Sequence, residues 1–372
     1  MNRFSFYCWL AAVFCLCMLF SFAGCTPDVP VPGSDSEGSV ATGTDTDTDT
    51  GIISSSDLEE DKGPVGLPEN GTEHLLMVTD IKKGRILVLD LNAEYPLDPD
   101  ALVWEWAAST ARGWKYPELC RVGLDDAKLR WSEYYQKYVV IITSSSGWAG
   151  IADYETRECL WETKVSSGPH SIEMLPNGDI VVACSGDTGH LRYYSITEGR
   201  NWKMVQDVEL ASAHGVLWDP QQQVLWALGH SRLNAYTVAE NGDVRLTQVE
   251  GKGASLSSYG ANGHDLSADY ADSDRLWIST GDRIVQFSKS QNRILSEFED
   301  SVLLYSQTNV KGISNFPDGT KVYCRGTGVQ YDWATDTFHV VAKVENGRMK
   351  RFPFRFTNRT VYKVRSFLAE YQ

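Results

Sequence analysis

A unit with one pattern of strands and turns recurs through the second half of the chain and constrains its fold more than any other feature. Each copy holds a short apolar strand, a turn, and a second apolar strand that leads through a Gly-containing turn into a third. The copies begin at His170, His214, His264 and Lys311, so their starts are 44, 50 and 47 residues apart. This period is typical of a four-stranded propeller blade.

Further segments extend the repeat toward both ends of the chain. Residues 126–129 and 138–142 form a divergent copy that starts 44 residues before the first full one. At the front, residues 75–78 and 85–89 have the pattern of a second and a third strand without a first. Residues 361–364 form a lone strand at the end. We therefore expect the C-terminal strand to complete the N-terminal blade, which closes the ring and removes open sheet edges.

The sequence thus predicts an all-β, six-bladed β-propeller of four-stranded blades over residues 73–372. The third strands of the four full copies are expected at 191–194, 233–236, 284–287 and 329–332. A seventh blade would need roughly 40 more residues than the chain has. The 31 Gly residues and the lack of long helix-forming stretches agree with an all-β protein rich in turns.

The N-terminus has the features of a processing signal. Residues 1–24 comprise Met-Asn-Arg, an apolar run and Ala23-Gly24, and Cys25 follows directly. This resembles the lipobox of bacterial lipoproteins, although Phe22 stands where Leu is usual. The resemblance implies that Cys25 is lipidated and anchors the protein in a bacterial cell envelope. The alternative is an uncleaved anchor helix, because the apolar run is long enough to span a membrane.

Residues 25–72 have the composition of an acidic, disordered tether. Between 26 and 72 there are eleven acidic residues and one basic residue, a net charge of −10 out of −15 for the whole chain. Such a segment has little to bury and repels itself. The acidic balance argues against a nucleic-acid partner, which would need a strongly basic face.

Cysteine spacing and short motifs exclude several kinds of chemistry. The four Cys residues after Cys25 (Cys120, Cys159, Cys184 and Cys324) include no CxxC pair, so we expect free thiols and neither a zinc knuckle nor a redox motif. The sequence also contains no Gly-rich phosphate loop, GxSxG or HExxH motif. Nucleotide binding and ordinary serine or zinc hydrolysis therefore have no support.

The repeat predicts a site as well as a fold, because the innermost strands of a propeller surround its central channel. The aligned strand starts predict a ring at one channel mouth: Asp126, His170, His214, His264, Lys311 and Lys363. The apolar spacing around Asp126 and Lys363 allows a shift of one residue. Turns on the same face add a second set: His190, His230, Asp282, Arg283 and Arg325. We treat both sets as candidate ligand-binding residues.

The segments 176–179 (Pro-Asn-Gly-Asp) and 214–220 (His-Gly-Val-Leu-Trp-Asp-Pro) resemble six-bladed propellers of the gluconolactonase-like and NHL-repeat kind. The chain is also similar to an uncharacterised family of bacterial lipoprotein propellers, which implies no activity. The metal-binding Glu, Asn and Asp of the gluconolactonase-like enzymes cannot be mapped here, because the aligned starts carry His and Lys.

Three interpretations of the ring stay open. His170, His214 and His264 could bind a divalent metal (Mn, Zn or Ca), which resembles the channel His cluster of propeller oligogalacturonate lyases and would suit a lyase or hydrolase acting on uronic sugars. Alternatively, His and Lys side chains form a cationic well for a small anionic or glycan-derived ligand, and protonated His would add charge in acid. The third interpretation is that polar residues line the channel because it is filled with water, and that they have no further function.

The remaining expectations concern aromatic residues and partners. Trp114, Tyr116, Trp148 and Tyr259 lie in predicted connections on the same face and could stack on sugar rings. We expect a monomer that binds a small molecule or oligosaccharide. A protein-interaction scaffold that uses the opposite face or the rim is the third class of function, and whether the protein is an enzyme stays open.

Overall fold

The computed structural model describes residues 74–94, 96–97, 99–195, 203–239, 242–328, 332–344 and 347–371. The predicted signal peptide, Cys25 and the predicted tether lie outside these residues. Within them, no helix combines the length and apolarity needed to cross a membrane.

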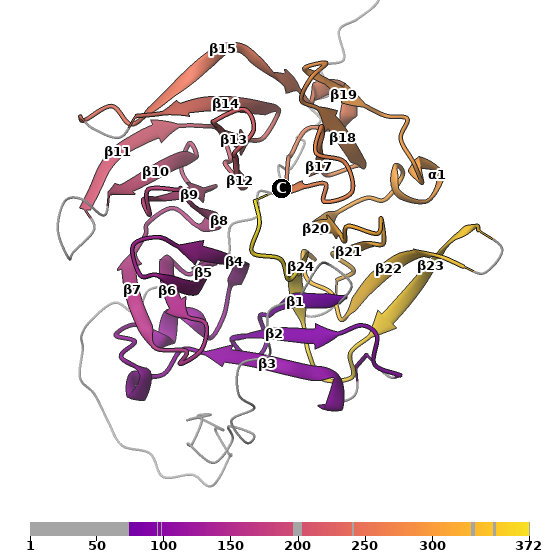
Figure 1. The fold of residues 1–372 in the computed structure, drawn as a ribbon, viewed down its shortest axis with the longest axis horizontal. Helices are drawn as coiled ribbons and strands as arrows, with labels where there is room; N and C mark the ends of the chain where they lie inside the picture. The colour runs from indigo at the N-terminus through magenta and orange to yellow at the C-terminus, as the bar shows by residue number, and fades with distance from the viewer. Residues whose placement is uncertain are drawn as a thin grey trace, which may run out of the picture. The chain divides into compact units, whose positions relative to one another are not determined.

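Six antiparallel sheets of four strands each surround a common centre (Figure 1). From the innermost to the outermost strand, blade 1 contains β24 (Val361–Ser366), β1 (Leu75–Asp80), β2 (Arg85–Asp90) and β3 (Leu102–Ala107); blade 2 contains β4 (Leu124–Ser132), β5 (Lys137–Ser144), β6 (Trp148–Asp153) and β7 (Cys159–Lys164); blade 3 contains β8 (Pro169–Met174), β9 (Ile180–Cys184), β10 (His190–Ser195) and β11 (Lys203–Glu209).

Blade 4 contains β12 (Gly215–Asp219), β13 (Val224–Leu228), β14 (Arg232–Val238) and β15 (Leu246–Ser255); blade 5 contains β16 (Asp265–Ala268), β17 (Arg275–Ser279), β18 (Ile284–Ser288) and β19 (Arg293–Leu295); blade 6 contains β20 (Val310–Asn315), β21 (Lys321–Arg325), β22 (Thr337–Lys343) and β23 (Met349–Arg355). The short helices are α1 (Ser301–Leu304) and the 3-10 turns Pro99–Ala101, Thr110–Arg112, Pro117–Cys120 and Ser257–Tyr259.

The C-terminal strand closes the ring, as the sequence predicted. β24 pairs with β1 antiparallel, with Val364 opposite Val78 and Arg365 opposite Met77. The chain end, marked C in Figure 1, lies near the common centre of the sheets. The N-terminal blade therefore receives its innermost strand from the last segment of the chain, which covers the inner edge of β1 and completes the sixth four-stranded sheet.

Apolar side chains between neighbouring blades form the core. The second strands are buried on both faces and consist largely of apolar runs, as in Ile180–Cys184 and Val224–Leu228. The innermost strands are buried as well but also carry polar and charged residues, as in Val310–Asn315. The outermost strands are more exposed, as in Lys203–Glu209. The four predicted free thiols are confirmed, and burial raises the pKa of Cys184 and of Cys324 to about 12.

Two of the four aromatic residues expected on the channel face belong to the core instead. Trp114 and Trp148 are 2% and 0% exposed, and with Trp106 they form a cluster whose ring centroids lie 5.2 to 6.2 Å apart. Burying these large rings between blades 1 and 2 outweighs any role on the surface. Tyr116 and Tyr259 stay partly exposed.

The third strand of blade 6 was predicted wrongly. It is β22 (Thr337–Lys343), which pairs with β21 so that Tyr323 lies opposite His339. Of the predicted strand 329–332, only Asp332 is among the described residues, and it lies in a turn whose carbonyl accepts a hydrogen bond from Asn309. Burial of Phe338 explains the difference, because it packs against the core and fixes the register.

A candidate ligand-binding ring at the channel mouth

A left-handed residue two positions before each ring residue turns the chain into the innermost strand. The residues concerned have φ values between 48° and 80°: Gly123, Gly168, Ser212, Asn262 and Asn309. Gly, Asn and Ser are small or form local hydrogen bonds, so they adopt this backbone more readily than bulky residues. Two residues later in each blade come the side chains of the ring: Asp125, His170, His214, His264 and Lys311.

These five side chains form a continuous series of contacts around the channel. The His170 and His214 rings stack with centroids 4.4 Å apart, and the His214 and His264 rings meet edge to face at 5.3 Å. The Lys311 Nζ atom lies 3.0 Å from His264 Nε2, and the Asp125 Oδ1 atom lies 3.0 Å from His170 Nδ1. All are buried, and His214, His264 and Lys311 are each 2% exposed.

Asp126 does not occupy the predicted ring position. The pairing of β4 with β5 shifts by one residue between Leu124 and Asp126, and the extra residue in this bulge is Asp125. The bulge presents Asp125 to His170 and places Asp126 in the layer below. There, Asp126 accepts hydrogen bonds from Arg365 at 2.6 Å and from Ser171 at 2.7 Å.

Lys363 also lies one layer below the ring. Its Nζ atom is 3.2 Å from the His170 carbonyl oxygen and 3.3 Å from an Asp265 carboxylate oxygen. Tyr362 takes the place next to His170, with its hydroxyl 3.5 Å from His170 Nδ1. The shift of one residue that the spacing allowed therefore occurs in both divergent copies.

Ion pairs fill the channel below the ring. Arg365 bridges Asp126 and Asp265, and these two carboxylates hold the pKa of the guanidinium above its usual range against the effect of burial. Further along, Arg130 donates two hydrogen bonds to Glu173, and the Lys128 Nζ atom lies 3.2 Å from the same carboxylate. Burial lowers the pKa of Lys128 to about 8.

The predicted residues in the face turns contact partners of their own. His190 Nδ1 lies 2.6 Å from Asp207 Oδ1, and Arg283 donates a hydrogen bond to the Tyr305 hydroxyl. Arg325, at the end of β21, is half-buried. Two more predicted residues of the face are exposed, His230 and Asp282. These residues lie around the ring on the same face, and they are not part of the series of direct contacts that runs from Asp125 to Lys311.

Hydrogen bonds determine which ring nitrogen of each histidine carries the proton. His214 Nδ1 lies 2.9 Å from the Ser212 carbonyl, which can only accept, so Nδ1 is protonated and Nε2 is a bare acceptor. His264 Nε2 accepts from the Lys311 ammonium, so its Nδ1 carries the proton. Within the described part of the chain, His214 Nε2 and His264 Nδ1 are buried polar atoms without a hydrogen-bond partner. Such groups are rare in folded proteins.

Burial lowers the pKa of both histidines well below the usual value. For His214, burial is the main cause, and the neighbouring His170 and His264 lower the pKa further. For His264, the Lys311 ammonium adds to the effect of burial. Both imidazoles are therefore neutral at pH 7. Acid adds charge to these two imidazoles only well below pH 6.5, and the Lys311 ammonium beside His264 supplies a positive charge at neutral pH.

The donor set does not suit the predicted metal. A cation would lie beside the Lys311 ammonium, which already occupies His264 Nε2. Nδ1 of His170 and Nδ1 of His214 face Asp125 and the Ser212 carbonyl, so these two rings could bind a metal only through Nε2. With His264 Nε2 next to Lys311, two of the three predicted histidine ligands remain, fewer than the three protein ligands of a typical zinc site. No group of three or more His, Cys, Asp or Glu in the ranges that the structure describes has an arrangement that could hold a metal ion.

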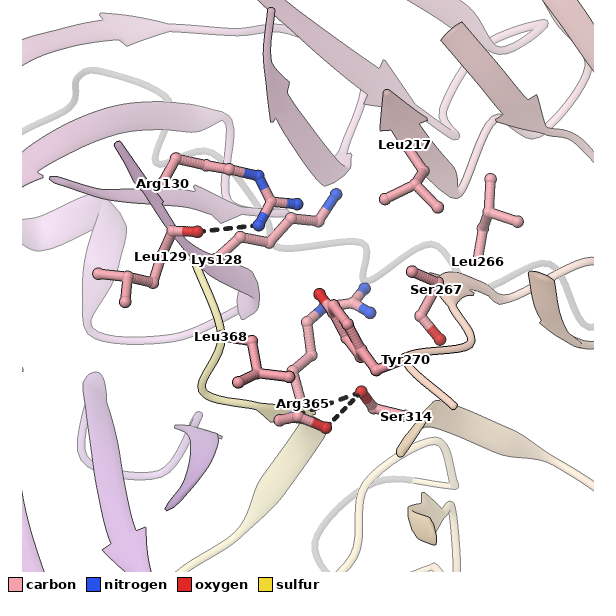
Figure 2. Close-up of a pocket in the computed structure, with 12 residues that line it drawn as sticks. Lys128, Leu129, Arg130, Leu217, Leu266, Ser267, Tyr270, Ser314, Arg365 and Leu368 are labelled. Carbon is pink, nitrogen blue, oxygen red and sulfur yellow. Dashed lines mark hydrogen bonds between the residues drawn. The ribbon is translucent and has the colours of Figure 1, made fainter. Parts of the chain in front are cut away.

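The C-terminal segment covers the other end of the channel. The Tyr371 hydroxyl donates to the Met174 carbonyl at 2.7 Å, and the Tyr270 hydroxyl donates to the Glu370 carbonyl at 3.1 Å. Arg130 lies 4.8 Å from the Tyr371 ring centroid. Figure 2 shows a narrow cavity beside this segment, with a volume of about 20 Å³, which is room for one water molecule. Leu368, Arg130 and Arg365 are among its lining residues.

Asp125 and Tyr362 belong to the ring but were not predicted from the sequence, although Asp125 has a sequence signal. Gly123 stands two residues before Asp125, as Gly168 stands before His170. An alignment on these turn residues, in place of the apolar positions, would have identified Asp125. Tyr362 has no such signal, since Thr360 occupies the corresponding place.

Several solved structures are similar to this chain. A functionally unknown protein from Desulfotomaculum acetoxidans has a TM-score of 0.48 and 12% identity, and the match covers 76% of this chain and 80% of that protein's chain. A protein of unknown function from Bacteroides caccae has a TM-score of 0.48 and 13% identity, covering 79% and 98%. A chain of a nidogen/laminin complex has a TM-score of 0.49 and 15% identity, covering 80% and 99%.

Comparison of the sequence with known proteins identifies a family but no individual relative. No curated protein matches the chain. The model of a protein family of unknown function (DUF6528) matches residues 48–349, which include nearly all of the propeller. The chain belongs to this family.

Proposed function

We propose that the protein is a lipid-anchored propeller of the bacterial cell envelope that binds a small anionic, glycan-derived ligand at its His/Lys ring. One observation carries the binding proposal. His214 Nε2 and His264 Nδ1 are buried polar atoms without a partner in the described part of the chain, and Lys311 lies next to them. Buried polar groups of this kind are costly unless a ligand or water satisfies them.

The charges around the ring support an anionic ligand. Lys311 and His264 line one side of the ring, and Asp125, the acidic residue of the ring, is engaged by His170, whose Nδ1 atom lies 3.0 Å from its carboxylate. The layer below pairs Asp126 and Asp265 with cations. The lyase hypothesis is less favoured, because its metal would have to bind beside the Lys311 ammonium.

Titration calorimetry with D-galacturonate tests the binding proposal. Lys311→Met should weaken binding about tenfold or more, because a hydrogen bond to a charged group contributes ~1.5–3 kcal/mol. Lys350→Met, in the exposed outer strand β23, serves as the matched control and should leave affinity unchanged. Equal affinities of the wild type and Lys311→Met would refute the proposal.

A further inference from the structure

The ring imposes a hydrogen-bonding requirement that a bare anion does not meet. His214 Nε2 can only accept a hydrogen bond, because the proton sits on Nδ1 and points to the Ser212 carbonyl. Carboxylate and sulfate oxygens are also acceptors only. An anion oxygen placed against His214 Nε2 would therefore bring two lone pairs together.

His264 has the opposite requirement. Its Nε2 atom is occupied by the Lys311 ammonium, so the buried Nδ1–H is a donor in need of an acceptor. The two rings meet edge to face at 5.3 Å, so an unmet acceptor and an unmet donor lie on adjacent side chains. A hydroxyl group is both donor and acceptor and can satisfy either atom.

His170 adds another acceptor to the ring. Its Nδ1 atom lies 3.0 Å from the Asp125 carboxylate and therefore carries a proton, so that Nε2 is an acceptor in the neutral tautomer. Two of the three imidazoles thus present acceptors, and Lys311 supplies the positive charge. The complementary ligand carries one carboxylate and more than one hydroxyl group.

We infer that the ring selects a hydroxylated carboxylate of the sugar-acid class over a plain carboxylate or an inorganic anion. This inference rests on the proposed function and specifies its ligand. The depth of the ring favours a small molecule over a polymer, since His214, His264 and Lys311 are each 2% exposed. The far end of the channel is covered by the C-terminal segment through Tyr371 and Met174.

A pair of six-carbon acids tests the inference with the full chain. D-gluconate and hexanoate have the same charge and chain length and differ in hydroxyl groups. By calorimetry, the wild type should bind D-gluconate at least tenfold more tightly than hexanoate or inorganic sulfate. His214→Asn keeps a donor near Nδ1 and removes the Nε2 acceptor, so it should weaken D-gluconate binding by a larger factor than hexanoate binding. His339→Asn, which alters a ring stacked on Tyr323 in blade 6, is the matched control.

The outcomes separate the inference from the proposed function. Equal affinity of the wild type for D-gluconate and hexanoate, with both lost in Lys311→Met, would overturn the inference and leave the anion site intact. Binding of none of these acids, or binding that Lys311→Met does not change, would overturn both. The comparison of acids in the wild type decides the matter even if His214→Asn does not fold.

Discussion

At the scale of single residues, the channel contains an unusual density of buried polar groups. Arg365 is held by Asp126 and Asp265 at 2.6 and 2.7 Å, and all three side chains are at most 9% exposed. Buried ions are tolerated when each has a partner, and they become costly when one partner is removed. The channel therefore depends on complete ion pairs, and single substitutions reveal this.

Arg365→Met should lower the free energy of unfolding by about 3–5 kcal/mol, because it removes the guanidinium that bridges two buried carboxylates and leaves them only the more distant ammonium groups of Lys363 and Lys128. Arg355→Met is the matched control, since the Arg355 side chain is 76% exposed and pairs with Asp336 at the surface. Its loss should cost no more than about 1 kcal/mol. Urea denaturation of both variants measures the difference, and similar losses would contradict the buried network.

The ring histidines make stability depend on pH. In the unfolded chain, His214 and His264 become protonated near pH 6.5. In the folded state the pKa of each lies well below this value, so both stay neutral to lower pH. The unfolded state then binds more protons, so the free energy of unfolding falls as the pH drops from about 6.5 to 5. Each histidine contributes a slope of up to ~1.4 kcal/mol per pH unit. His264→Asn should reduce the slope, whereas His230→Asn, at an exposed position, should not.

At the scale of elements, two parts of the C-terminus have separate tasks. β24 supplies the innermost strand of blade 1, and the residues after it cover the far end of the channel. Phe367 donates its backbone N–H to the Leu75 carbonyl, and Tyr371 reaches blade 3 at Met174. The two parts can be removed independently.

Deletion of residues 359–372 should abolish cooperative folding or lower the melting temperature steeply, because it exposes the edge of β1 in blade 1 and the apolar side chains of blade 6 that pack against Val361 and Val364. Deletion of 368–372 keeps β24 and should cause a smaller loss, since it removes the Tyr371 and Glu370 contacts. Thermal melts followed by circular dichroism compare the two. A 359–372 deletion that melts like the full chain would refute closure by β24.

The periodic spacing of apolar residues made the six blades predictable from the sequence. It did not predict features that other kinds of residue determine. The starts at His170, His214, His264 and Lys311 all lie on the observed ring, because they share a register with the strands that follow. A β-bulge cannot be recognised from the spacing of apolar residues, because an inserted residue such as Asp125 changes the register without changing the apolar run. The ion pairs below the ring join residues far apart in sequence, and no local pattern reveals them.

At the scale of the whole molecule, the predicted anchor at Cys25 and the candidate ring lie in separate segments of the sequence. The lipobox resemblance predicts that Cys25 carries lipid, and the acidic residues after it would hold the domain away from the bilayer. The ring lies within a domain that closes on itself through β24. Anchoring and ligand binding should therefore be separable by mutation.

Cys25→Ser should abolish lipid attachment and leave the propeller folded, because the substitution lies far from residues 73–372 in sequence. Metabolic labelling with a fatty acid, followed by a thermal melt of the purified protein, measures both. Cys159→Ser, a half-buried thiol inside the propeller, is the control and should retain the label. Persistent labelling of Cys25→Ser would contradict the anchor.

The central claim is that the buried ring of imidazoles and Lys311 binds a small hydroxylated acid, and ¹⁵N NMR of the wild-type protein with labelled histidine tests it most directly. The chain has seven histidines, few enough to assign by substitution. Addition of D-gluconate should shift the signals of His214 Nε2 and His264 Nδ1, two buried atoms of the ring without a hydrogen-bond partner in the described part of the chain. The signals of His339, which lies in blade 6 on β22 and stacks on Tyr323, should stay unchanged. Saturable binding of D-gluconate with no change at His170, His214 or His264 would contradict the account.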